Sequence, residues 1–217
     1  MSRSAHPTYY DRLGNPVPSV TTIIGRFKDS GALLYWANKV GREGKTLNEA
    51  RDPAALAGTL AHQLVEAHLR GQAEPVLEGD PDAVAKARAA FEAYLRWEAM
   101  VRVEIMYAEV ALVSERYKFG GRLDAIAKIG GDLALMDWKT ANAIYVDYTL
   151  QLAAYQLLWE ESYPDHPLVG GFHLCRFSKE DGDFSHHYFP RLEKEAIAFL
   201  KMRELYDLMK ECERRVK

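Results

Sequence analysis

The stretch Gly120–Thr140, GGRLDAIAKIGGDLALMDWKT, decides the fold of this chain. It consists of two largely apolar runs separated by Gly130-Gly131. A glycine pair between two such runs is a strong signal for a β-hairpin with a two-residue turn. The tightest register pairs Ile129 with Asp132 and thereby sets every other cross-strand pair. The segment therefore predicts two antiparallel strands joined by a tight turn.

This register brings charged side chains together at the far end of the hairpin. Asp124 is expected opposite Asp137, and Arg122 opposite Lys139. Because side chains alternate along a strand, Asp137 and Lys139 point to the same face. Opposed residues have Cβ atoms roughly 4.5–5.5 Å apart, and like charges at that distance destabilise a sheet. Two carboxylates and a lysine are thus expected to converge on one patch.

A hard divalent cation would relieve this repulsion. Mg²⁺ binds carboxylate oxygens at about 2.0–2.1 Å and keeps several of its waters. The apolar Ile126, Leu133 and Leu135 share the face, so we expect the carboxylates to be partly buried, where repulsion is stronger than in water. The alternative is a structural Asp–Lys–Asp cluster in which Lys139 neutralises one acid. The geometry favours a metal site and leaves the structural cluster open.

Composition limits the classes of protein to consider. The chain has 217 residues, 48% hydrophobic and 27% charged, which is typical of a soluble globular protein and fits one large domain, residues 1–217. We expect no membrane span, because no apolar run is long enough, and no secretory signal. Cys175 and Cys212 cannot form a four-cysteine zinc or iron–sulfur site. A reducing cytoplasm is the expected compartment.

Charge is distributed unevenly along the chain. Residues 1–51 carry eight Lys and Arg against four acidic residues, a balance of +4, so the remainder carries −7 to reach the formal net charge of −3. A basic N-terminal segment is a candidate for contacting phosphates, whereas the acidic remainder suits metal binding. A solvated helix face explains the same charges, and both interpretations stay open.

Apolar periodicity and chain breakers predict the other elements. Helices are expected at 31–45, 53–69, 81–101, 147–163 and from 193 onwards, and further strands at 103–113, 168–177 and 184–189. This order predicts an α/β fold with a central mixed β-sheet flanked by helices and with a helical N-terminal region. The strand 132–138 is apolar on both faces, so we expect it at the centre of the sheet.

Two helical pairs are candidates for the same site. Gly58, His62 and Glu66 are spaced by four, so they share one helical face. Glycine within a helix costs about 1 kcal/mol of stability relative to alanine. Close approach of this helix to the sheet would explain why glycine is present, and it would also place His62 near the sheet. Gln151 and Tyr155 form a second such pair after the hairpin. Taken singly, each pair is an ordinary surface or core contact.

The strand expected before the hairpin carries one acid, Glu109, among apolar residues. Its side chain is directed either at the acidic patch or at solvent along the edge of the sheet. The pattern allows both.

Four short motifs occur in order along the chain: G-x-x-x-H at Gly58–His62, G-R-x-D at Gly121–Asp124, D-W-K-T at Asp137–Thr140 and Q-L-x-x-Y at Gln151–Tyr155. In this order and spacing they resemble the motifs of the PD-(D/E)XK nucleases, especially the RecB-type exonuclease branch with its phage and bacterial recombination exonucleases. The motifs lie within residues 55–163, and a looser similarity covers nearly the whole chain. The resemblance implies a restriction-endonuclease-like core.

The resemblance also implies roles for individual residues. Asp124 and Asp137 would be catalytic and would bind Mg²⁺ or Mn²⁺. The backbone carbonyl of Trp138 and the side chain of His62 would add ligands. Lys139 would place the attacking water or steady charge on the scissile phosphate. The substrate-positioning residues would be Glu66, Arg122, Gln151 and Tyr155.

The implied function is a metal-dependent exonuclease that hydrolyses phosphodiester bonds at DNA ends in recombination or repair, in a bacterial or phage-infected cell. With a reference pKa of about 10.4, Lys139 is expected to act as a cation rather than as a base. The helicase motif G-x-x-x-x-G-K-S/T is absent from the sequence, so any unwinding would come from a partner. A helicase or a single-strand annealing protein is the implied partner, and no iron–sulfur cluster is expected.

Two other functions stay open. One is an inactive DNA-binding protein on a nuclease fold. The presence of both acids and of Lys139 argues against this function. The other is a zinc hydrolase using His62 with His173, His186 or His187. No histidine pair has metalloprotease spacing, so the zinc hydrolase is the weaker alternative.

Overall fold

The computed structural model describes residues 8–28, 31–44, 46, 53–178 and 183–216 of the chain. Its centre is a five-stranded sheet in the order β3-β4-β5-β6-β7. The strands are β3 (Val103–Ser114), β4 (Phe119–Ile129), β5 (Asp132–Thr140), β6 (Phe172–Phe177) and β7 (Phe184–Phe189). Strands β5 and β6 are parallel and the other neighbours antiparallel, so the sheet is mixed, as expected.

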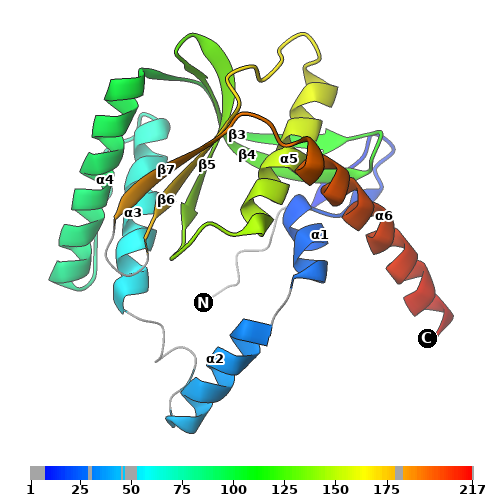
Figure 1. Ribbon diagram of the computed structural model, residues 1–217, viewed down its shortest axis with the longest axis horizontal. Helices are drawn as coiled ribbons and strands as arrows, with labels where there is room; N and C mark the ends of the chain where they lie inside the picture. Colours follow the sequence, from blue (N-terminus) through cyan, green and yellow to red (C-terminus); the bar gives the residue numbers. More distant parts are fainter. Residues whose placement is uncertain (1–7, 29–30, 45, 47–52, 179–182, 217) are drawn as a thin grey trace.

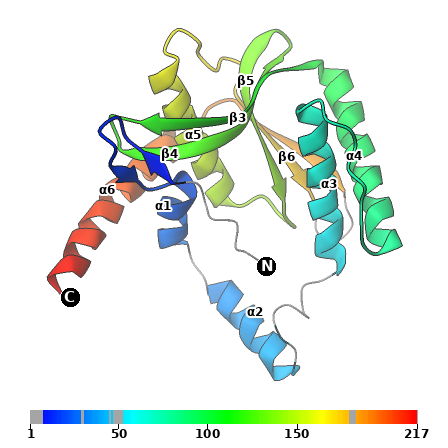
Figure 2. The ribbon, with the colours of Figure 1, turned by 180° about the vertical axis from the view of Figure 1, so that it is seen from behind.

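Helices cover both faces of this sheet (Figure 1). One face carries α3 (Pro53–Leu69) and α4 (Pro81–Val101), and the other carries α1 (Val20–Phe27), α5 (Val146–Ser162) and α6 (Glu193–Arg215). The reverse view shows the same two layers, with α2 (Gly31–Arg42) projecting away from them (Figure 2). A short hairpin of β1 (Tyr9–Tyr10) and β2 (Pro16–Val17) precedes α1. The expected α/β fold is confirmed.

The hydrophobic core has one part on each face of the sheet. Leu135 of β5 is buried with the apolar residues of α5, whereas Met136 and Trp138 are buried with those of α3 and α4. A strand that is apolar on both faces must be covered on both, and β5 lies in the middle of the sheet, as predicted.

The Gly130-Gly131 turn has the predicted conformation. Its φ angles are +63° and +97°, and a hairpin turn of this kind requires positive φ at both central residues. Ile129 pairs with Asp132, which confirms the tight register.

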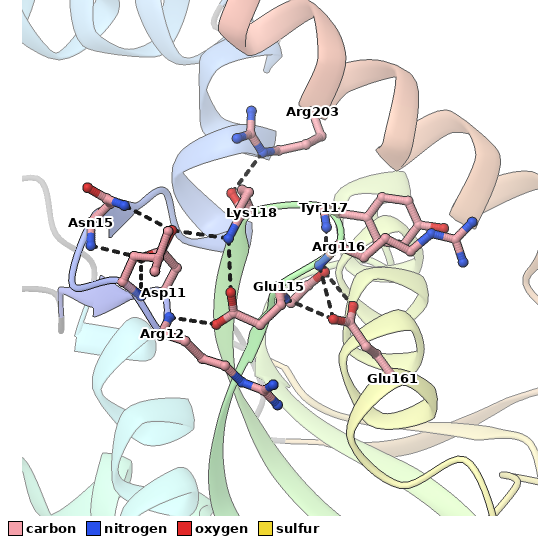
Figure 3. Close-up of polar contacts among 11 residues, drawn as sticks. Asp11, Arg12, Asn15, Glu115, Arg116, Tyr117, Lys118, Glu161 and Arg203 are labelled. Carbon is pink, nitrogen blue, oxygen red and sulfur yellow. Dashed lines mark hydrogen bonds and ion pairs between the residues drawn. The ribbon is translucent and has the colours of Figure 1, made fainter.

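A polar cluster ties the N-terminal hairpin to the sheet and to α6 (Figure 3). The Asp11 carboxylate accepts the backbone N–H of Asn15 at 2.8 Å and lies 3.1 Å from the Lys118 ammonium. Lys118 also contacts Glu115 at 2.9 Å, and its carbonyl accepts a hydrogen bond from Arg203 Nε at 3.0 Å. The cluster therefore joins the β1–β2 hairpin, the β3–β4 turn and α6.

Replacing Asp11 by Ala is expected to lower the melting temperature at neutral pH. The backbone N–H of Asn15 and the Lys118 ammonium lower the pKa of Asp11 to about 2. A carboxyl group whose pKa is lower in the folded than in the unfolded protein stabilises the fold at pH values above its unfolded-state pKa. This stabilisation is lost as the pH falls through the pKa of the folded state. Thermal melts from pH 7 to pH 2 should show the two proteins converging below about pH 4. Asp165→Ala, at an exposed position, is the control, and an equal effect there would contradict the prediction.

Candidate active site

The site lies where β4 and β5 separate. Their pairing runs from the turn as far as Ala125 and Met136 and then stops. Beyond this pair β4 continues alongside β3, and β5 continues alongside β6. Asp124 and Asp137 are the first residues past the junction, so the acids occupy the opening between two diverging strands.

This divergence corrects one expectation. Arg122 was expected opposite Lys139, but Arg122 pairs with Ala111 of β3 and Lys139 pairs with Arg176 of β6. The register is right for the paired part of the hairpin, which ends at Ala125 and Met136, and both Arg122 and Lys139 lie beyond that end.

The acids and Lys139 nevertheless converge. Asp137 is fully buried, and the Lys139 Nζ lies 2.6 Å from its Oδ2. Asp124 accepts a hydrogen bond from the backbone N–H of Trp138 at 3.0 Å. The Asp124 carboxylate therefore bridges the point where the ladder ends. Among the residues that the structure describes, no hydrogen-bond donor reaches Asp137 Oδ1.

Burial and charge shift the pKa of all three groups. Burial, followed by the charge of Asp137, raises the pKa of Asp124 to about 6. Burial also raises the pKa of Asp137. For Lys139 burial acts in the opposite sense, but the two carboxylates prevail and raise its pKa. Lys139 therefore stays protonated at neutral pH, whereas the acids resist double ionisation unless further positive charge is supplied.

The donor set fits a hard divalent ion. Two carboxylates, one with a buried oxygen that lacks a donor, are the ligands that Mg²⁺ accepts while it keeps several waters. Within the described ranges, no three His, Cys, Asp or Glu side chains are grouped closely enough to hold a metal by themselves. The remaining ligands would come from the backbone and from water. Such a site suits Mg²⁺ or Mn²⁺ better than structural zinc.

Helix α3 brings His62 to the same place. His62 lines a cleft with Asp124 and Trp138, and it lies within electrostatic reach of Asp124. The other lining residues are Val65, Glu66, Leu69 and Arg70 of α3 with Ala108 and Glu109 of β3. The structure thus places His62 beside Asp124, and its role as a ligand stays a prediction.

Gly58 makes this approach of α3 possible. The Thr140 hydroxyl donates to the Gly58 carbonyl at 3.1 Å. A Cβ at Gly58 would clash with the Thr140 side chain and lie 3.3 Å from the Ser178 carbonyl oxygen. The expectation that this glycine permits close contact between helix and sheet is confirmed.

Replacing Gly58 by Ala is expected to destabilise the fold by about 1–2 kcal/mol, because overpacking outweighs the gain in helix propensity. The shift of α3 would also move His62 away from Asp124. Urea denaturation measures the first effect. Gly41→Ala in α2, where nothing lies within 4 Å of the added Cβ, should leave stability unchanged or increase it. A Gly58→Ala protein as stable as the wild type would contradict the packing argument.

Gln151 and Tyr155 form the expected pair on α5. Gln151 Nε2 donates to the Tyr155 hydroxyl at 2.6 Å, and Tyr155 is buried. Burial, and then the charges of Asp137 and Asp124, raise the pKa of Tyr155 well above its usual value. The pair therefore lies within electrostatic reach of the acids. Tyr155 also lines a second pocket, together with Tyr9, Ser19, Val20, Thr21, Gly121 and Arg122.

An ion-pair network occupies the rim of the cleft. Arg70 Nη2 lies 2.7 Å from Glu66 and 3.9 Å from Glu109, and Arg122 Nη1 lies 3.3 Å from Glu109. Glu66 and Arg122 were predicted site residues. Arg70 was missed, although its spacing of four from Glu66 was a signal. Tyr148 was also missed, and the Lys139 Nζ lies 5.7 Å from the centre of its ring.

The zinc hydrolase finds no support in this geometry. His173 Nδ1 and His186 Nε2 are 2.9 Å apart, so the two rings are hydrogen-bonded to each other. His187 Nε2 lies 3.1 Å from the Ser185 hydroxyl. In the described part of the chain, His62 belongs to no three-residue group able to hold a metal.

The basic charge of residues 1–51 is partly neutralised within the fold. Arg26 forms an ion pair with Glu213 of α6, and Lys28 lies 2.8 Å from Asp147 of α5. The described helices include none with the length and apolar character needed to cross a bilayer.

The mixed sheet with helices on both faces corresponds to a restriction-endonuclease-like core. The family model of the PD-(D/E)XK nuclease superfamily matches residues 26–211, and the chain belongs to that superfamily. No curated protein sequence matches the chain.

Solved structures show distant similarity. One is a Eubacterium rectale protein with a provisional exonuclease description, at 15% identity and a TM-score of 0.49 over 69% of this chain. The chain covers 64% of the length of that protein. Another is LHK-Exo in complex with dAMP, at 15% identity and a TM-score of 0.33 over 77% of this chain and 97% of that one. LHK-Exo is an alkaline exonuclease from Laribacter hongkongensis. At these values neither similarity assigns an activity to this chain.

Proposed function

We propose that this chain is a divalent-metal-dependent deoxyribonuclease, and more specifically an exonuclease that hydrolyses phosphodiester bonds at DNA ends in recombination or repair. Membership of the superfamily supports nuclease chemistry. The observation that carries the proposal is the buried Asp137 with Lys139 at 2.6 Å and Asp124 beside it, at the opening between two strands. Lys139 neutralises one of these two acids, and a metal ion would neutralise the other.

The proposed metal ligands are Asp124, Asp137 and the backbone carbonyl of Trp138. His62 lines the same cleft as Asp124 without forming a three-residue metal group with the two acids, and it would have to move onto the ion to act as a further ligand. The two carboxyl groups have raised pKa values, so binding of a metal ion would displace protons from them. When bound, Mg²⁺ or Mn²⁺ supplies Lewis-acid chemistry at a phosphate oxygen and lowers the pKa of water.

Lys139 acts as a cation in this proposal. Its raised pKa makes it a poor general base at neutral pH. Its ammonium is held by Asp137 and therefore cannot rotate freely. From that position it stabilises negative charge that develops on the scissile phosphate and orients the attacking water.

The proposed substrate-positioning residues surround this centre. Arg122 is partly exposed at the rim, where a guanidinium binds phosphate oxygens well. Glu66 orients Arg70. Gln151 and Tyr155 hold the DNA end or orient Lys139, and their mutual hydrogen bond keeps both side chains in place.

The wider proposal treats residues 1–217 as one nuclease domain that acts in the cytoplasm beside a helicase or an annealing protein. Within the basic N-terminal segment, Lys39 and Arg42 on the projecting α2 are exposed and suit contacts with the DNA backbone.

Digestion of end-labelled linear duplex with Mg²⁺ or Mn²⁺ tests the proposal, with closed circular DNA and EDTA as controls. The expected result is release of labelled nucleotides from linear DNA alone, and its abolition by EDTA and by Asp137→Asn. Cutting of the circles would replace the exonuclease with an endonuclease. Binding without cleavage under all metal conditions would support the inactive DNA-binding protein instead.

A further inference from the structure

Glu109 has an unusual backbone for a residue within a strand. Its φ angle is +56°, in the left-handed region, which strains a non-glycine residue. Arg102 and Lys118 are the other non-glycine residues of the described chain with positive φ. They lie at the end of α4 and just before β4, where the chain changes direction. Glu109 lies inside β3.

This conformation coincides with a reversal of the strand faces. The β3–β4 ladder pairs the residues on either side of Glu109 and Asp124 but does not pair these two. Leu123 packs in the core under α5 and Ala125 in the core under α3 and α4, although residues two apart in a regular strand share a face. Glu109 and Asp124 therefore lie at the switch, and both line the cleft with His62.

The Glu109 carboxylate links the two walls of that cleft. Its Oε2 lies 3.3 Å from Arg122 Nη1 of β4 and 3.9 Å from Arg70 Nη2 of α3. The arginine side chains are 47% and 37% exposed, so both guanidinium groups remain accessible at the rim.

Stability does not account for this arrangement. Exposed ion pairs contribute little to stability, less than the left-handed backbone conformation costs. Glycine would adopt the same φ without strain. What the glutamate adds is the placement of two guanidinium groups beside the predicted metal site.

We propose that Glu109 is a positioning residue, which holds Arg122 and Arg70 where they bind the phosphodiesters next to the one that is cleaved. This inference rests on the proposed nuclease function. A guanidinium has five N–H donors, so the contact with Glu109 leaves donors for phosphate oxygens. The carboxylate itself repels DNA, and it acts by orienting the arginines.

Glu109→Gln and Glu109→Gly separate positioning from simple electrostatics. Coulomb's law alone predicts that removing this negative charge strengthens DNA binding and leaves cleavage at least as fast. The positioning role predicts the opposite for catalysis, namely a ten- to hundredfold lower single-turnover rate at saturating DNA, on the scale of roughly 10²-fold for misplaced groups. Rates equal to the wild type in both variants would overturn the proposal.

A double-mutant cycle tests whether Glu109 acts through its partner. If it does, Glu109→Gln should cost little further once Arg122 has been replaced by Gln, because the two effects share one interaction. If the reductions in cleavage rate caused by the two single substitutions multiply in the double variant, the proposal is overturned.

Arg102→Gly is the matched control. It removes the same kind of strain at the end of α4, so it should raise the melting temperature as Glu109→Gly does, while cleavage stays at the wild-type rate. If Glu109→Gly proves unstable, the isosteric Glu109→Gln decides.

A measurement without cleavage keeps the two proposals distinguishable. A wild-type protein that fails to cut DNA would end the nuclease proposal alone. Fluorescence anisotropy of a labelled duplex in EDTA would still test Glu109, since each lost phosphate contact lowers the slope of log affinity against log salt by about one. A slope unchanged by Glu109→Gln would overturn the positioning role.

Discussion

Asp124→Asn is expected to lower cleavage roughly a thousandfold or more, because it removes a carboxylate from a metal whose contribution is several kcal/mol, at about 1.4 kcal/mol for each factor of ten. The same variant should be more stable than the wild type without metal at pH 7.5. Burial and Asp137 raise the pKa of Asp124 to about 6. A group with a raised native pKa favours folding at low pH, and that contribution is lost as the pH rises through the native value.

The stability difference therefore has a defined pH dependence. It should be small at pH 4, close to the unfolded pKa, should grow between about pH 4 and pH 6, and should level off above pH 6 at no more than about 3 kcal/mol, given about 1.4 kcal/mol for each pKa unit. Mg²⁺ should raise the wild-type melting temperature at pH 7.5 and leave that of the variant unchanged. Asp132→Asn, at an exposed position beside the turn, is the control. A metal-free variant less stable than the wild type at pH 7.5 would contradict the electrostatic account.

Lys139→Ala is expected to slow cleavage by roughly 10²–10³-fold while DNA binding stays measurable, on the scale of losing one preorganised charge-stabilising group. The Lys139 ammonium lies 2.6 Å from Asp137 Oδ2, and the two carboxylates raise its pKa. Lys139→Arg keeps the charge and should retain more activity than the alanine variant. Single-turnover cleavage and anisotropy measure the two properties separately.

Lys128→Ala is the control for this experiment, because Lys128 lies in the same hairpin near the turn, paired with Leu133. It should cleave like the wild type. Wild-type turnover by Lys139→Ala would remove Lys139 from the mechanism. An arginine variant no better than alanine would show that the shape of the ammonium group matters more than its charge.

Much of the site was predictable because its determinants are local. A glycine pair with positive φ sets the turn, and the strict alternation of a strand then sets the register as far as Ala125 and Met136. Helical spacing placed His62 and Tyr155 on defined faces, and the motif order indicated the superfamily. These features depend on residues close together in sequence, so they can be read without coordinates.

Tertiary structure decided where the hairpin stops and what surrounds the acids. The β4–β5 ladder stops at Ala125 and Met136, while β5 goes on pairing with β6 along its other edge, and no local pattern reveals the resulting gap at Asp124. The contact between Glu109 and Arg70 likewise depends on α3 lying beside β3 at the cleft. Turn chemistry and periodicity act over a few residues, whereas the choice of neighbour for each strand and helix is made by the whole core.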